Sequence, residues 1–118
     1  MATDLFRVVI HQKLNEGQLE NFLRVTGGLT AMVEANEPDT LAYEFYVSDD
    51  GTEAYVLSTF KDSASFLVHE SRAWEAGYVE PDFGPLTAVV LGSPSAEARE
   101  VLSWLKPAYF PLFVGCTR

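Results

Sequence analysis

The sequence has 118 residues, 47% of them hydrophobic and 21% charged, which predicts one folded globular domain rather than a disordered chain. Eight Lys and Arg residues against 17 Asp and Glu give a net charge of −9, which argues against binding to nucleic acid or to anionic membranes. The single cysteine, Cys116, excludes a disulfide within the chain. No apolar run is long enough for a membrane span and residues 1–4 lack a signal-peptide pattern, so we expect a cytoplasmic protein.

Residues 5–14 predict the first strand, because apolar and polar side chains alternate along them. Phe6, Val8 and Ile10 share one face, which suits contact with helices. Arg7 and His11 lie on the other face, which is polar enough to border a cavity or water.

Residues 16–35 predict a long amphipathic helix with Asn15 as its N-cap. Gly27 and Gly28 interrupt the pattern, and they can serve either close packing on a sheet or a local bend. The run Asn-Glu-Pro-Asp at residues 36–39 ends the helix, because the residue before a proline disfavours helical geometry.

Residues 41–48 and 53–61 predict two strands of a hairpin, joined by a short polar turn. A second helix begins with Asp62 or Ser63 as its N-cap, carries His69 near its middle and is expected to stop at Gly77. Residues 78–85 predict a loop because they hold two prolines and a glycine.

The C-terminal third predicts a strand at residues 86–91 and a helix at residues 96–105 capped by Ser95. The tail at residues 108–115 is strongly apolar. We expect it to pack on its own domain or on a partner subunit, as an edge strand that tolerates Pro111.

The predicted order is strand, helix, strand, strand, helix, strand, which is a ferredoxin-like α+β arrangement of a four-stranded antiparallel sheet with helices on one face. With the E-x-x-E-P-D-T turn at residues 34–40, the run L-A-Y-E-F-Y-V-S-D-D, the strand ending T-F-K-D and the helix S-A-S-F-L-V-H, this order resembles the antibiotic biosynthesis monooxygenase family. The resemblance implies a single domain over residues 1–118, with a core at about residues 5–91 and a C-terminal extension at residues 92–118. It also implies that two sheets pair into a dimeric α+β barrel.

The family includes cofactor-free oxygenases of quinols and polycyclic phenols, and haem-degrading enzymes. Its recurrent polar residue is a histidine in the second helix, which His69 matches. The haem-degrading members also use an asparagine on the first strand and a tryptophan at the end of the third. This chain has His11 and Phe60 instead, which argues against haem degradation.

The resemblance makes His69 the candidate catalytic residue, either as a general base or as a polar anchor, while a local hydrogen-bonding role is the alternative. Arg7 and His11 are candidate substrate-binding residues if their strand face lines the barrel, and otherwise form a solvated face. Tyr43 and Phe60 are candidates for stacking on a flat aromatic ligand, although the same residue types also fill ordinary cores.

Two functions remain open on these grounds. One is a cofactor-independent monooxygenase acting on a phenol, quinol or polyketide-type aromatic, and the other is a non-catalytic small-molecule binder or accessory subunit. A structural dimer module without a cavity is a third reading. No nucleotide, flavin or metal motif occurs, so no cofactor is expected, and the expected partners are a second copy of the chain and a small aromatic molecule.

Overall fold

The computed structural model describes residues 4–75 and 82–116 and has eight strands and helices plus one 3₁₀ turn. In chain order they are β1 (Phe6–Lys13), α1 (Leu19–Asn36), β2 (Thr40–Val47), β3 (Glu53–Phe60), α2 (Ser63–Glu75), β4 (Leu86–Leu91), α3 (Ala96–Leu102), the 3₁₀ turn Ser103–Leu105 and β5 (Ala108–Phe110). The predicted helix stop at Gly77 and the first part of the predicted loop, residues 78–81, lie outside the described residues. None of the described helices is both long enough and apolar enough to cross a membrane.

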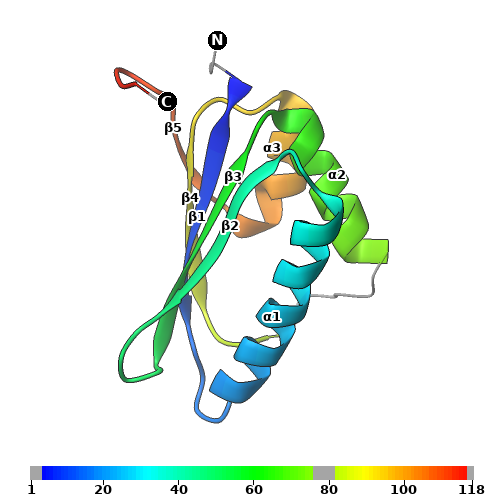
Figure 1. Cartoon of the computed structure of the whole chain (residues 1–118). Coiled ribbons are helices and arrows are strands. Elements are labelled where there is room, and N and C mark those ends of the chain that lie inside the picture. The colour runs from blue at the N-terminus through cyan, green and yellow to red at the C-terminus, as the bar shows by residue number, and fades with distance from the viewer. Residues whose placement is uncertain (1–3, 76–81, 117–118) are drawn as a thin grey trace.

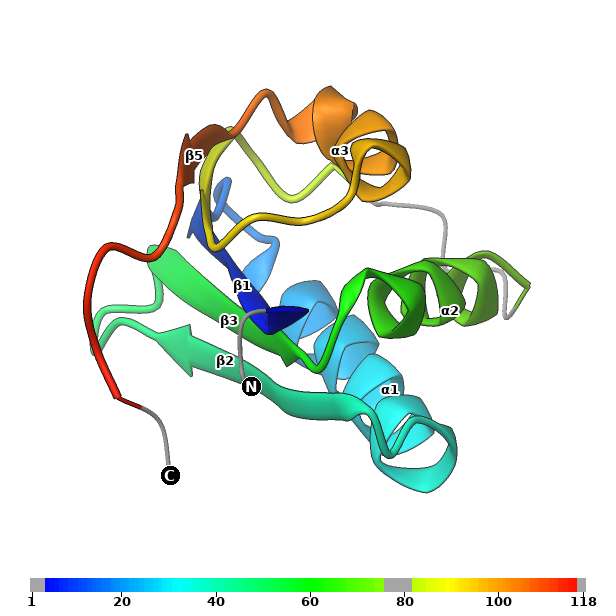
Figure 2. The same cartoon turned by 90° about the horizontal axis from the view of Figure 1, so that it is seen from above.

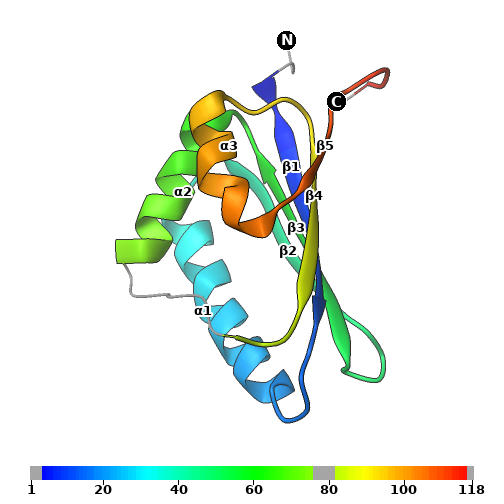
Figure 3. The same ribbon diagram turned by 180° about the vertical axis from the view of Figure 1, so that it is seen from behind.

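One five-stranded sheet with the order β2-β3-β1-β4-β5 forms the base of the molecule. The first four strands pair antiparallel, which confirms the predicted ferredoxin-like order (Figure 1). The short β5 pairs parallel to β4, a direction that the sequence did not indicate. α1, α2 and α3 all cover the same side of the sheet and leave the other side open (Figures 2 and 3).

Two clusters of buried side chains join this helix layer to the sheet. The larger one packs Phe6, Phe60 and Phe66 together, and its ring centroids lie 5.2–5.7 Å apart. The smaller one brings Phe22 of α1 against Phe83, with ring centroids 5.1 Å apart. The predicted apolar face of β1 is therefore the face that meets the helices.

The start of α1 differs from the prediction. The helix begins at Leu19 with Gln18 as its N-cap, and no side chain caps it. Gly17 has a φ of +84°, which turns the chain away from a helical path, and the Gln18 amide donates to the carbonyl of Asn15 (3.0 Å). Asn15 therefore closes a turn instead of capping the helix.

The caps of the other two helices are as predicted. Asp62 Oδ1 accepts a hydrogen bond from the Ser65 amide (2.8 Å) at the start of α2. Ser95 Oγ accepts one from the Ala98 amide (3.2 Å) at the start of α3. The α-helical part of the predicted helix at residues 96–105 ends at Leu102, and its last turn is 3₁₀.

The first residues of β2 contain a bulge, because Thr40 pairs with Phe60 and Ala42 with Thr59. Apolar and polar residues alternate over residues 41–47 of the sequence, which predicts that Leu41 and Tyr43 share one face. In the structure the extra residue, Leu41, is exposed and does not share the inner face with Tyr43. From Tyr43 onward the predicted alternation holds.

Candidate functional site

A cavity of about 730 Å³ lies between the helices and the sheet. All three helices and strands β1 to β4 contribute to its wall, together with residues 82–84. Apolar side chains make up most of it, among them Val8, Ile10, Phe22, Val25, Leu29, Phe45, Val56, Leu86 and Leu105. A cavity of this size and character is typical of a small-molecule site.

Aromatic rings line one wall of the cavity. Tyr43 and Phe45 of β2 pack edge to face, with ring centroids 5.0 Å apart. The imidazole of His69 lies 5.1 Å from the Tyr43 ring and 5.4 Å from the Phe60 ring, measured between centroids. Such a wall can contact the face or edge of a flat aromatic ligand.

The strongest polar feature at the cavity is a buried pair formed by His69 and Glu37. Nδ1 of His69 lies 2.8 Å from Oε1 of Glu37, and the side chains are only 8% and 2% exposed. A carboxylate at this position accepts a hydrogen bond from Nδ1–H, which fixes the tautomer and the ring orientation. Nε2 is then the ring nitrogen that remains for a ligand in the cavity.

The E-P-D-T turn holds Glu37 in place. Glu37 is the C-cap of α1, where its amide donates to the carbonyl of Val33 (2.9 Å), and Pro38 then stops the helix. The Thr40 amide donates back to the Glu37 carbonyl (3.2 Å) and the Thr40 hydroxyl to Glu37 Oε1 (3.0 Å). No described residue donates to the second oxygen, Oε2, although it is buried. The turn therefore holds a carboxylate whose Oε1 contacts His69 and whose Oε2 accepts no hydrogen bond from the described residues.

Glu70 adds a second carboxyl group to the cavity wall. It follows His69 directly in α2 and is half-buried. Burial raises its pKa, the nearby Glu37 raises it further and His69 works in the opposite direction. At a given pH, a larger fraction of Glu70 is therefore in the carboxylic acid form than for an ordinary surface glutamate.

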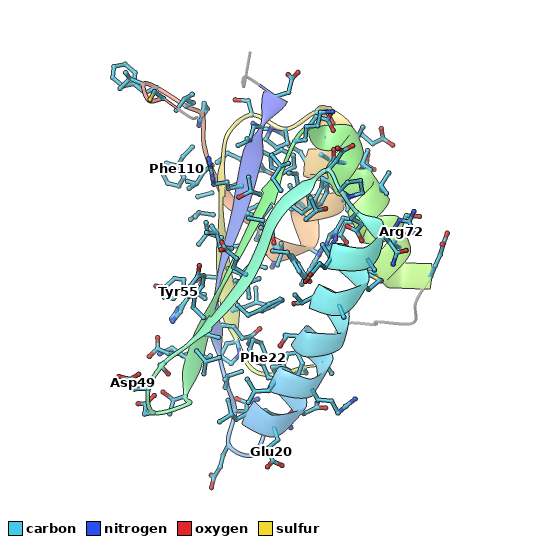
Figure 4. The ribbon with its side chains drawn as sticks, viewed as in Figure 1. Glu20, Phe22, Asp49, Tyr55, Arg72 and Phe110 are labelled. Atoms are coloured by element: carbon cyan, nitrogen blue, oxygen red, sulfur yellow. The ribbon has the colours of Figure 1, made fainter. Side chains whose placement is uncertain are left out.

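Arg7 and His11 do not share this cavity, because they lie on the open face of the sheet. There His11 Nε2 is 2.6 Å from Oε1 of Glu53, and its ring stacks on Tyr55 with centroids 4.8 Å apart. Figure 4 shows Tyr55 and Phe110 projecting from this open side, whereas Phe22 lies between α1 and the sheet. A substrate-binding role for Arg7 and His11 stays a prediction about that open face.

Three predicted site residues, Tyr43, Phe60 and His69, meet at one cavity wall. The sequence interpretation missed the roles of Glu37 and Glu70. A charged residue placed directly before the proline that ends α1 was the available signal for Glu37. Nothing in the local pattern distinguished Glu70 from a solvated helix residue. Within the described residues, no group of three or more His, Cys, Asp or Glu side chains is arranged to hold a metal ion.

No family model and no curated protein matches the sequence. The structure defines a ferredoxin-like α+β domain with a cavity beneath its helices, and solved structures share that architecture. It is similar to MupZ from Pseudomonas fluorescens, with a TM-score of 0.77 and 22% identity over 98% of this chain and 95% of that one. A likeness over 98% of the chain includes residues after Leu91 and therefore α3.

Two further structures carry a family name. A "putative antibiotic biosynthesis monooxygenase" from Caulobacter crescentus CB15 matches with a TM-score of 0.60 and 21% identity over 80% of this chain and 93% of that one. Another from Nitrosomonas europaea matches with a TM-score of 0.62 and 14% identity over 79% and 93%. Because these identities are low, the likeness establishes the fold alone. The chain has the fold of the antibiotic biosynthesis monooxygenase-like proteins, and the resemblance inferred from the sequence is confirmed at that level.

Proposed function

We propose that this protein is a cofactor-independent monooxygenase that binds a phenolic, quinol or polyketide-type aromatic molecule in the cavity. The observation that carries the proposal is the buried Glu37–His69 pair, whose imidazole faces a wall of aromatic rings. A cavity of about 730 Å³ has room for a molecule of two or three fused rings.

The proposed chemistry begins with proton transfer. Nε2 of His69 takes the proton of a substrate hydroxyl or of an activated CH group, while Glu37 holds the imidazole at Nδ1 and balances the charge that forms. The resulting anion is electron-rich and reduces molecular oxygen itself. For an anthrone the reaction balances as one CH₂ group plus O₂ giving one C=O group plus water, so no external reductant is needed.

The rest of the cavity supports this role by excluding water and fixing orientation. The wall is mainly apolar, so water competes little with the reacting anion and oxygen. Tyr43 and Phe60 flank the imidazole and can hold a flat ring beside Nε2.

We further propose that the open face of the sheet meets a second copy of the chain. Large apolar side chains are exposed there and along the tail, including Tyr55, Phe110, Leu112 and Phe113, the last being 96% exposed. Exposed apolar surface of this kind typically marks an interface. A monomer by light scattering at micromolar concentration would contradict this assignment.

Aerobic oxygen uptake with a panel of hydroquinones and anthrones tests the enzymatic proposal. We expect uptake above the protein-free rate for the wild type, a loss of about 100-fold or more in His69→Ala, and little change in the control Glu20→Ala, whose side chain is exposed on α1 and does not line the cavity. The non-catalytic binder would be favoured instead by two results together. No variant would take up oxygen, and a ligand would co-purify with the protein or raise its melting temperature without being transformed.

A further inference from the structure

We propose that Glu70 forms a second polar subsite of the cavity, in which its carboxylic acid donates a hydrogen bond to an uncharged ring carbonyl while His69 receives a phenolic hydroxyl. The inference rests on the proposed function and deepens it. It names the residue of this chain that would receive the second oxygen of such a ligand.

Position in the fold supports this pairing. His69 and Glu70 are consecutive residues of α2, and both line the cavity. Successive helix residues point about 100° apart, so the two side chains reach different parts of the same wall. A rigid planar ligand can therefore meet both groups only if its two oxygens are separated along the ring edge.

Among the described side chains, no hydrogen bond or ion pair involves the carboxyl group of Glu70, whereas the carboxyl group of Glu37 is held by two donors. A half-buried carboxyl group in an apolar wall is costly unless it is neutral or finds a partner. A ligand oxygen would supply that partner.

The charges around Glu70 favour its neutral form. The titratable groups that act on it are His69 on its own helix and Glu37 at the end of α1, and Tyr43 of β2 and Asp82 also line the cavity. Burial and the negative Glu37 raise the pKa of Glu70, and only His69 opposes them. A bound ligand removes more water and moves the pKa in the same direction.

Two carboxyl groups beside one histidine would then have different roles. Glu37 stays an acceptor that orients His69, while Glu70 becomes a donor to the ligand. An ionised Glu70 would instead repel a ketone oxygen and attract an amine, so the pH dependence of binding separates these cases.

The test uses 1,8-dihydroxyanthraquinone, whose C10 carbonyl is separated from its hydroxyl groups along the ring system and which has no oxidisable CH₂ group. Its binding is measured by the quenching of the protein's tryptophan fluorescence, from about pH 5 to about pH 9. We expect wild-type affinity to fall as pH rises, because Glu70 loses its proton. Glu70→Gln keeps a donor and should bind without that fall, and comparing the two at each pH cancels the ionisation of the ligand itself.

Two further variants complete the design. Glu70→Ala should bind about 10-fold more weakly than the wild type at low pH, because the ligand carbonyl loses its donor. Glu20→Ala is the control, since Glu20 is exposed on α1 and should change nothing. Equal affinity of Glu70→Ala and wild type, or the same fall in Glu70→Gln, would overturn the Glu70 subsite while leaving the aromatic ligand class intact. No binding by any variant would overturn both.

Discussion

The buried Glu37–His69 pair makes a quantitative prediction about stability. His69→Ala leaves the carboxylate of Glu37 buried with only the Thr40 hydroxyl as a donor. A buried carboxylate that loses one of its hydrogen-bond donors typically costs about 3 kcal/mol of unfolding free energy. Glu37→Ala leaves the imidazole Nδ1 without its acceptor, which costs about 1–3 kcal/mol.

The double variant removes both groups. Each substitution should therefore lower the unfolding free energy much less in the background of the other than it does in the wild type. We expect a coupling free energy of about 2 kcal/mol, within the range measured for contacting residues. The side chains are 8% and 2% exposed, so water can replace little of the lost interaction. The coupling should therefore be well above the value for an exposed pair.

Urea unfolding of the wild type, the two single variants and the double variant measures this coupling, provided that the slopes against urea agree. The control cycle uses Lys61 and Asp39, a pair at 3.9 Å near the same end of the sheet with side chains 60% and 58% exposed. It should give no more than about 0.5 kcal/mol. If the free-energy costs of the two substitutions in the buried pair also added to within about 0.5 kcal/mol, the argument that Glu37 holds His69 would be refuted.

Three other substitutions have expected outcomes. Gly27→Ala should stabilise the protein by about 1 kcal/mol in thermal unfolding, because Gly27 lies within α1 and an added Cβ meets open space; a lower melting temperature would contradict this. Gly92→Ala should destabilise by more than about 1 kcal/mol, because φ is +127° and the new Cβ would lie 2.6 Å from Phe6 Cβ; an unchanged melting temperature would count against the close approach. Hydrogen bonds from Ser65 lower the pKa of Asp62, so the stability that they add is present above the ordinary Asp pKa and is lost as pH falls through the lowered value. Asp62→Asn should therefore show less acid-dependent loss of melting temperature than the wild type, and identical acid profiles would reject this cause.

Local patterns in the sequence were sufficient for most of the fold. Alternation located β1 to β3, a short apolar run located β4, and the capping side chains Asp62 and Ser95 located the starts of α2 and α3. The turn at Gly17 was missed because its positive φ depends on how the chain re-enters α1, which composition alone does not reveal. The parallel direction of β5 was missed because three residues carry too little pattern to orient a strand.

The candidate site was only partly predictable, for a physical reason. Family resemblance identified His69, and its neighbours Tyr43 and Phe60 follow from strand faces. Glu37 lies 32 residues before His69, and only the packed fold brings the two together. Arg7 and His11 were grouped correctly on one strand face, but the sequence does not say which face of a sheet bears a cavity.

The central claim is that His69 takes a proton from an aromatic ligand held in the cavity. The most direct test is an anaerobic absorption spectrum of an anthrone mixed with the protein near neutral pH, since the substrate anion absorbs at longer wavelength and cannot react onward without oxygen. The account predicts that the anion band appears with the wild type and with the control Glu20→Ala, and is absent with His69→Ala. A band of equal size with His69→Ala, or no band with the wild type, would contradict it.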